Sequence, residues 1–281
     1  MPELPEVETV KKTLQKLVVG KTIADVTVLW PRIVKLPDDV EEFRIRLIGQ
    51  TIQDIGRRGK FLKLMLDEDV IVSHLRMEGR YTLSEHGEPH DKHTHVIFTF
   101  TDQSELRYRD VRKFGTMHVF ARGEEEKHLP LSHLGPEPLG RGFTAAYLAE
   151  KLAKTVRNVK AVLLDQTVVA GLGNIYVDES LFRARIHPQR PGNTLTEAEI
   201  VRLHRAARKT LREAVTQGGS TIRTYVNGHG EMGMFQQSLF VYARRGEPCK
   251  VCGTELEKQV VAGRGTHYCP NCQPLEREEI R

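Results

Sequence analysis

The first residues of the chain could carry out covalent chemistry on an electrophilic carbon. The sequence begins Met1-Pro2-Glu3-Leu4-Pro5-Glu6. If the initiator Met1 is removed, the nitrogen of Pro2 becomes a secondary amine, and an amine that attacks a sugar or carbonyl carbon forms a Schiff-base adduct. An α-amino group has a reference pKa of about 7.7–8.0, so much of it is neutral at working pH. Because the iminium of a secondary amine stays cationic, it would also act as an electron sink for later eliminations.

Two carboxylates lie close to that amine in the sequence. Glu3 is adjacent to it, and Glu6 falls early in a predicted helix, because Pro5 suits a first helical position and apolar residues then recur at helical spacing. Acidic residues in a first turn ordinarily complement the helix dipole, and this explains Glu6 without any chemistry. It does not explain why Pro2 is followed at once by Glu3. Proton transfer and helix capping both stay open for these carboxylates.

All four cysteines lie in two close pairs near the C-terminus. Cys249 and Cys252 are separated from Cys269 and Cys272 by a spacer of 16 residues. Each pair can supply two thiolates from a tight turn, and two such turns close a tetrahedral zinc site. Since four sulfurs leave no open coordination position, the zinc would be structural. Two disulfides are the alternative, which close pairing in a chain expected to be intracellular disfavours.

Four further residues are candidate contacts to phosphate. Arg264, with glycine on both sides, falls at a predicted hairpin tip between the cysteine pairs; a solvated turn arginine is the alternative. Asn174 begins a predicted helix, where free N–H groups and the dipole favour a phosphate, although asparagine also caps helices without a ligand. Lys60 is a third candidate, for which a solvated strand end is the alternative. His74 is another.

A loop with a guanidinium and an aromatic ring could read a base. An enzyme that works on a base in duplex DNA flips it out of the stack, and something must fill the hole. Arg112 could bond the orphaned partner base, Phe114 could wedge the stack, and Met77 could enter the vacated space as a flexible apolar plug. Core packing is the alternative for Phe114 and Met77, and residue type alone favours it.

The elements that would position these residues fall into two regions. Residues 22–120 contain many short runs rich in β-branched and aromatic residues, which predict a β-sandwich behind the N-terminal helix. A Pro- and Gly-rich segment at 134–140 then predicts a domain boundary, and residues 144–216 predict helices, including one with a capping box at Thr196 to Glu199. Five glycines in 217–238 predict a long mobile loop, and loops of this length are uncommon unless they are functional or disordered. The expected strands are 22–29, 51–55, 60–66, 70–74, 94–100, 105–108 and 116–120.

Composition limits the class of protein. A chain of 281 residues suits two domains, and 39% hydrophobic with 28% charged residues is ordinary for a globular protein. No apolar run is long enough to span a membrane and no signal peptide is apparent, so we expect a cytoplasmic protein. A net charge of +5 favours a polyanionic partner.

The opening Met1-Pro2-Glu3-Leu4-Pro5-Glu6-Val7 resembles the start of the formamidopyrimidine-DNA glycosylases, bacterial enzymes that excise oxidised purines. The resemblance resumes at 109–115, 166–179, 220–225 and 264–269, and it spans residues 1–273. It implies an α+β fold in two domains: a β-sandwich with an N-terminal helix over 1–134, a helical domain with a helix-two-turns-helix element and a lesion loop over 135–238, a zinc finger over 239–273, and an unassigned tail over 274–281.

The resemblance also implies what the candidate residues do. The Pro2 amine attacks C1′ of the flipped nucleotide, Glu3 protonates the sugar oxygen, and Glu6 positions the amine. Backbone atoms of 220–225 cradle the everted base. The expected catalytic residues are Pro2, Glu3, Glu6, Lys60 and Arg264. The expected DNA-binding residues are His74, Met77, Arg112, Phe114, Asn174 and Arg264. The expected metal ligands are Cys249, Cys252, Cys269 and Cys272.

The implied activity is that of a bifunctional DNA glycosylase and lyase, a monomer that acts on duplex DNA with oxidised purines or abasic sites. One alternative is an endonuclease VIII type acting on oxidised pyrimidines, which Leu4 and the pair Arg112 and Phe114 argue against. The other is a zinc protein that binds damaged DNA without catalysis.

Overall fold

The structure is a computed structural model that describes residues 1–220 and 233–275. The described residues form two compact units. Unit 1 takes the described parts of Met1–His133 and Gly218–Met234, and unit 2 takes those of Leu134–Gln217 and Phe235–Arg281. Our sequence-based assignment of 135–238 to the helical domain therefore differs at Gly218–Ser220 and Gly233–Met234, which the structure groups with the N-terminal unit.

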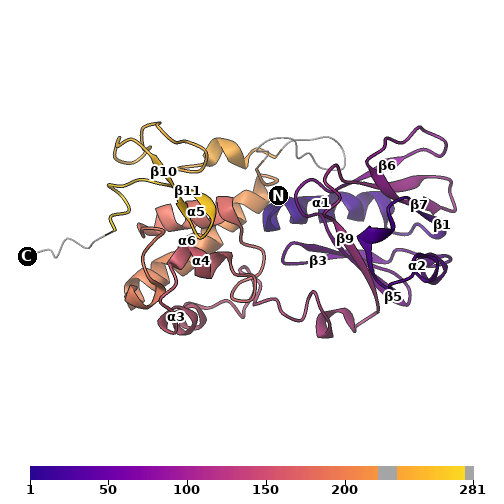
Figure 1. Cartoon of the computed structure of the whole chain (residues 1–281), viewed down its shortest axis with the longest axis horizontal. Coiled ribbons are helices and arrows are strands. Elements are labelled where there is room, and N and C mark those ends of the chain that lie inside the picture. The colour runs from indigo at the N-terminus through magenta and orange to yellow at the C-terminus, as the bar shows by residue number, and fades with distance from the viewer. Residues whose placement is uncertain (221–232, 276–281) are drawn as a thin grey trace, which may run out of the picture. The chain divides into compact units, whose positions relative to one another are not determined.

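Unit 1 contains two β-sheets (Figure 1). One has the strand order β1-β7-β8-β6 and the other β2-β9-β5-β4-β3. All neighbours are antiparallel except β2 and β9. One core cluster draws Phe98 and Leu106 from the first sheet and Ile71 and Val119 from the second, which is the predicted sandwich. The strands are β1 Ile23–Val28, β2 Val34–Leu36, β3 Asp54–Arg58, β4 Phe61–Met65, β5 Asp69–His74, β6 Arg80–Ser84, β7 Thr94–Phe100, β8 Glu105–Arg109 and β9 Thr116–Ala121.

Helix α1, Leu4–Val18, carries the chain start against the second sheet. Its buried stripe, Val7, Val10, Leu14 and Val18, follows helical spacing and joins the sandwich core. The helix packs on β3 and β4. Because Glu8 bonds Arg57 and Gln15 bonds Asp54, the start of the helix lies at the end of these strands where the β3–β4 turn connects them.

Two strands, β2 and β6, and one helix of unit 1 were not among the elements expected from the sequence. Residues Val40–Leu47 form helix α2, capped by Asp39, whose carboxylate accepts the N–H of Glu42 at 2.8 Å. Only Phe43 and Leu47 are buried on this helix, and two apolar residues four apart are too short a pattern to identify a helix. Two short 3-10 turns, η1 Pro31–Ile33 and η2 Glu125–Lys127, complete unit 1.

Unit 2 is helical and ends in a small hairpin. The capping box at the start of α6 is confirmed, since the side chains of Thr196 and Glu199 each accept the other residue's backbone N–H. The mixed α+β fold is confirmed as a whole. The elements are α3 Ala145–Ala153, α4 Val159–Leu164, α5 Asn174–Ala184, η3 Gly192–Thr194, α6 Glu197–Thr216, η4 Phe235–Ser238, β10 Glu257–Val261 and β11 Arg264–Tyr268. None of the helices in the described part of the chain is long and apolar enough to cross a membrane.

Candidate active site and nucleic-acid interface

The chain start is built as a reciprocal cap. Glu3 is the N-cap of α1, its carboxylate accepts the N–H of Glu6, and the Glu6 Oε2 atom accepts the N–H of Glu3 at 2.8 Å. Both side chains and Pro2 are buried, whereas Met1 is 45% exposed. Glu3 and Glu6 therefore do cap the helix. This does not exclude a role in proton transfer, because the cap also fixes both carboxylates next to Pro2.

Glu6 also holds a segment that is more than two hundred residues away in sequence. Its Oε1 atom accepts the backbone N–H of Ser220 at 2.8 Å and the Ser220 hydroxyl at 3.2 Å. At Gly219, which has a φ of +81°, an added Cβ would lie 2.7 Å from the same Oε1 atom. Only glycine fits there. Of the predicted lesion loop 220–225, Ser220 is thereby placed against Glu6, and 221–225 lie outside the described residues.

Lys60 and His74 lie close together beside the β3–β4 turn. Lys60 is buried, so the solvated strand-end alternative is wrong. The Nδ1 atom of His74 accepts the N–H of Arg76 at 2.8 Å, and burial together with the charges of Arg76 and Lys60 lowers the pKa of His74 to about 3. A neutral imidazole with Nδ1 as acceptor carries its hydrogen on Nε2. His74 therefore stays neutral near pH 7, with its ring hydrogen on Nε2.

An ion pair that the sequence did not reveal ties this turn to α1. The Nε atom of Arg57 lies 2.8 Å from a carboxylate oxygen of Glu8, and its Nη1 atom donates to the carbonyl of Gly59 at 2.8 Å. Burial raises the pKa of Glu8, but hydrogen bonds from Arg57 and Lys11 outweigh it and the net pKa is lowered. Through Arg57, Glu8 therefore ties the start of α1 to the β3–β4 turn that contains Lys60.

The predicted wedge residues lie on two neighbouring exposed loops. Met77 follows β5 and Phe114 precedes β9, and these strands pair at His74 and Thr116. Met77 is 36% exposed and Phe114 is 52% exposed, so core packing is excluded for both. The guanidinium of Arg112 lies 5.2 Å from the ring centre of Phe114. A cation and two apolar side chains thus project from one edge of the sandwich.

Two buried residues shape these loops, and sequence reasoning missed both. The carboxylate of Asp110 accepts the N–H groups of Arg112, Phe114 and Gly115 at 2.8–3.0 Å. The hydroxyl of Tyr108 lies 2.2 Å and 1.8 Å from where Cβ atoms at Gly79 and Gly115 would stand. Both glycines are therefore required for the loops to close on this ring. The Arg-Asp-Val-Arg run of the sequence contained Asp110, but nothing in it signalled the inward direction of that side chain.

In unit 2, Arg264 and Asn174 belong to one assembly. Arg264 is exposed at the end of the β10–β11 hairpin. Asn174 is the first residue of α5, with Gly173 as the cap, so the plain N-cap alternative is wrong for Asn174. Its Nδ2 atom donates to the carbonyl of Gly265 at 2.8 Å, and its buried Oδ1 atom has no hydrogen-bond partner among the described residues. The predicted phosphate residue thus holds the hairpin next to Arg264.

A buried ion pair, also missed, fixes the same hairpin. Lys160 and Asp178 are fully buried, and the Lys160 Nζ atom lies 2.6 Å from Asp178 Oδ1 and 2.7 Å from the hydroxyl of Thr266. The second Asp178 oxygen accepts the N–H of His267 at 2.9 Å. Helices α4 and α5 therefore grip β11 through charge-assisted hydrogen bonds.

The four cysteines form the predicted metal site. Their Sγ atoms lie within 4.8 Å of one another, with Cys249 to Cys272 at 3.9 Å and Cys252 to Cys269 at 3.5 Å. Tetrahedral zinc with bonds of about 2.3 Å separates its sulfurs by about 3.8 Å, whereas a disulfide needs about 2.05 Å. The donor set and its spacing fit one structural zinc.

A β-sandwich headed by a proline and two carboxylates, with a helical unit that ends in a four-cysteine finger, is the architecture of a zinc-finger DNA glycosylase. Residues 1–117 match the model of the formamidopyrimidine-DNA glycosylase N-terminal domain, 134–226 that of its H2TH domain, and 246–275 that of the zinc finger found in FPG and IleRS. The chain belongs to the formamidopyrimidine-DNA glycosylase family.

Individual relatives agree over almost the whole chain. This chain is 64% identical over 273 residues to the formamidopyrimidine-DNA glycosylase of Geobacillus kaustophilus. The matched region covers 97% of this chain and 100% of the relative. The formamidopyrimidine-DNA glycosylase of Bacillus licheniformis is 63% identical, and the match covers 97% of this chain and 99% of that protein. Among solved structures, a Lactococcus lactis Fpg variant bound to Fapy-dG-containing DNA has a TM-score of 0.92 at 44% identity, over 97% of this chain and 100% of that one. Lactococcus lactis Fpg bound to DNA with an abasic site has a TM-score of 0.91 at 44% identity, over 97% and 99%.

Proposed function

We propose that this protein is a bifunctional DNA glycosylase and lyase that removes oxidised purines such as 8-oxoguanine and formamidopyrimidines from duplex DNA, a step of base excision repair. The observation that carries the proposal is the start of the chain, where Pro2 is followed by two buried carboxylates fixed in a reciprocal cap. Relatives at 64% and 63% identity carry the formamidopyrimidine name, which favours oxidised purines over the pyrimidines of the endonuclease VIII type.

The geometry supports a division of roles among these residues. Once Met1 is removed, the Pro2 nitrogen forms a bond to C1′ as the bond from C1′ to the base breaks. Glu3 delivers a proton to the sugar ring oxygen, which opens the ring and leaves a cationic iminium. The iminium then promotes loss of the 3′ phosphate and, in a second elimination, of the 5′ phosphate. Glu6, bonded to Glu3 and Ser220, is a positioning residue.

The remaining residues hold the DNA. Lys60 and His74 supply a buried charge and a neutral donor near the chain start, and Met77, Arg112 and Phe114 fill and read the space left by the flipped base. In unit 2, Asn174 and Arg264 contact phosphates. The zinc holds the hairpin that carries Arg264 and takes no part in the chemistry. We propose further that the protein works as a monomer in the cytoplasm.

The function is tested by excision of 8-oxoguanine under single-turnover conditions with the Glu3→Gln variant. Glutamine keeps an acceptor for the N–H of Glu6, so α1 stays capped, but it cannot donate a proton as an acid does. We expect excision to fall by about 10²–10⁴-fold, the usual contribution of general acid catalysis, with lesion-duplex affinity unchanged. Excision at the parental rate would show that Glu3 is not the acid.

A further inference from the structure

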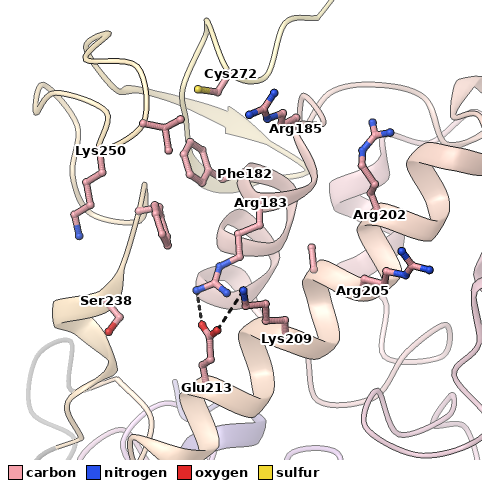
Figure 2. A pocket seen from close by; sticks show the side chains of 13 residues that line it. Phe182, Arg183, Arg185, Arg202, Arg205, Lys209, Glu213, Ser238, Lys250 and Cys272 are labelled. Atoms are coloured by element: carbon pink, nitrogen blue, oxygen red, sulfur yellow. Dashed lines mark ion pairs between the residues drawn. The ribbon is translucent and has the colours of Figure 1, made fainter.

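A basic cavity in unit 2 is not used by the proposed chemistry. Its volume is about 800 Å³, within the range of sites that bind small ligands or short peptide segments. It is formed by the end of α5, the exposed face of α6, and the residues around Cys272 and Lys250 of the zinc finger (Figure 2). None of the residues proposed to contact DNA lines it.

The charge of the cavity is one-sided. Six cationic side chains line it and only one carboxylate, Glu213. Figure 2 shows Arg183 and Lys209 directed at that carboxylate, with ion pairs of 2.6 Å and 3.9 Å. Among the described residues no carboxylate lies within ion-pair distance of the other cations of the cavity, which are Arg185, Arg202, Arg205 and Lys250. Four positive charges are thus left for an anionic partner.

The cavity also has an apolar side. Phe182 and Phe240 stack with ring centres 5.3 Å apart, buried Ala206 lines the same cavity, and Val251 on the zinc finger is 57% exposed. An exposed aliphatic side chain next to aromatic carbon and a ring of cations suits a partner that brings carboxylates and an apolar side chain together.

Nucleic acid fits this cavity less well. A duplex is too wide to enter it and would leave the apolar side uncovered. A single strand would bind by stacking its bases on aromatic faces. The ring of Phe240 is stacked by Phe182 and flanked by the cations of Arg183 and Lys250 at 5.2 Å and 5.7 Å from its centre, so no free aromatic face is offered.

We propose that this cavity is a docking site for an acidic peptide segment of a partner protein, in which carboxylates flank one large apolar side chain. The apolar side chain packs against Val251, which is exposed and lines the same cavity as Ala206. The carboxylates bind Arg185 and Lys250 at either side, and Arg202 and Arg205 on α6. Such a site would recruit the enzyme to a partner without occupying its DNA-binding residues.

The test uses the full-length, zinc-loaded protein and a fluorescent ten-residue peptide of Asp and Glu around a central Phe, followed by fluorescence anisotropy. We expect saturable binding that weakens with salt and that a Phe-to-Ser peptide loses. The double variant Arg202→Glu, Arg205→Glu should lower the affinity for the peptide by at least about tenfold, while excision from a short lesion duplex stays at the parental level. The matched control is Lys12→Glu with Lys16→Glu, two exposed cations of α1, which should leave peptide affinity unchanged.

Val251→Glu provides a second variant, because it adds a negative charge at an exposed position without removing a cation. This variant too should lower the affinity for the peptide. Peptide binding that is absent, or that survives Val251→Glu and the Arg202→Glu, Arg205→Glu pair, would overturn the proposal. So would a single-stranded oligonucleotide that binds at these residues in place of the peptide. Parallel loss of lesion-duplex binding in the variants would make the cavity part of the DNA interface and would equally contradict it.

Discussion

Single side chains of this protein serve the fold and the site at once. Glu6 caps α1, holds the N–H of Glu3 and anchors Ser220, so one carboxylate connects the expected acid with the start of the lesion loop. The place of Glu6 in the first turn of a helix was predictable from the sequence, because helix starts depend on neighbouring residues. It could not predict the bond to Ser220, because that contact depends on how distant segments fold together.

Arg112 separates the reading of a base from the holding of a backbone. The carboxylate of Asp110 accepts its backbone N–H, while its guanidinium lies beside the ring of Phe114 on the exposed loop before β9. If it bonds the orphaned cytosine, Arg112→Ala should cost about 1–3 kcal/mol against a duplex that presents cytosine, and less against other opposite bases.

The measurement is excision of 8-oxoguanine paired in turn with C, T, G and A. The control is Lys113→Ala, the neighbouring cation, which lies over Trp30 and not over Phe114. An equal loss against all four duplexes would show Arg112 to be a phosphate contact.

His74 predicts a specific dependence of stability on pH. The pKa of His74 is about 3 in the folded protein against an ordinary histidine value of 6.5, so between these values the unfolded chain binds a proton that the folded protein does not. Stability should therefore fall as the pH drops below about 6.5, by at most about 1.4 kcal/mol per pH unit from this residue.

His74→Asn keeps an acceptor for the N–H of Arg76 and removes this titration. Denaturant unfolding near neutral pH and near pH 5 should show a smaller acid-induced loss in the variant than in the parent. His90→Asn, at an exposed position, is the control and should retain the parental loss. Equal losses in all three proteins would rule out a neutral buried His74.

At the scale of elements, local signals were reliable and long-range ones were not. The strand at Thr94–Phe100, the capping box of α6 and the helix that starts at Asn174 follow from residue type and spacing. Helix α2 was missed because only two of its residues are buried. Strand order and the inward direction of Asp110 or Lys160 depend on tertiary contacts, which no spacing encodes.

The pair of Lys160 and Asp178 should behave as one unit. Lys160→Met leaves a buried carboxylate without its cation, and Asp178→Leu leaves a buried ammonium, so each should cost about 3–5 kcal/mol of unfolding free energy. The double variant removes both charges and should recover most of that loss. Denaturant unfolding of the zinc-loaded proteins gives the double-mutant cycle. Additive losses would mean that the two groups do not depend on each other.

For the whole molecule, the distribution of the candidate residues over two units was predictable from sequence, because each set of motifs stays within one stretch of chain. Unit 1 carries Pro2, the two carboxylates and the wedge; unit 2 carries Asn174, Arg264 and the four cysteines. The net charge of +5 suits a polyanionic substrate. The basic cavity around α6 was not predictable, since its cations come from separate elements and look like ordinary surface residues.

The central claim is that the Pro2 amine is the nucleophile, and borohydride trapping tests it most directly. Borohydride reduces the iminium to a stable bond, so protein freed of Met1 should form a covalent adduct with DNA containing 8-oxoguanine. After digestion, mass spectrometry should place the DNA remnant on the peptide that begins with Pro2. Protein that retains Met1 should give no adduct, because its Pro2 nitrogen is an amide. An adduct on a lysine such as Lys60, or one formed equally well with Met1 retained, would contradict the mechanism.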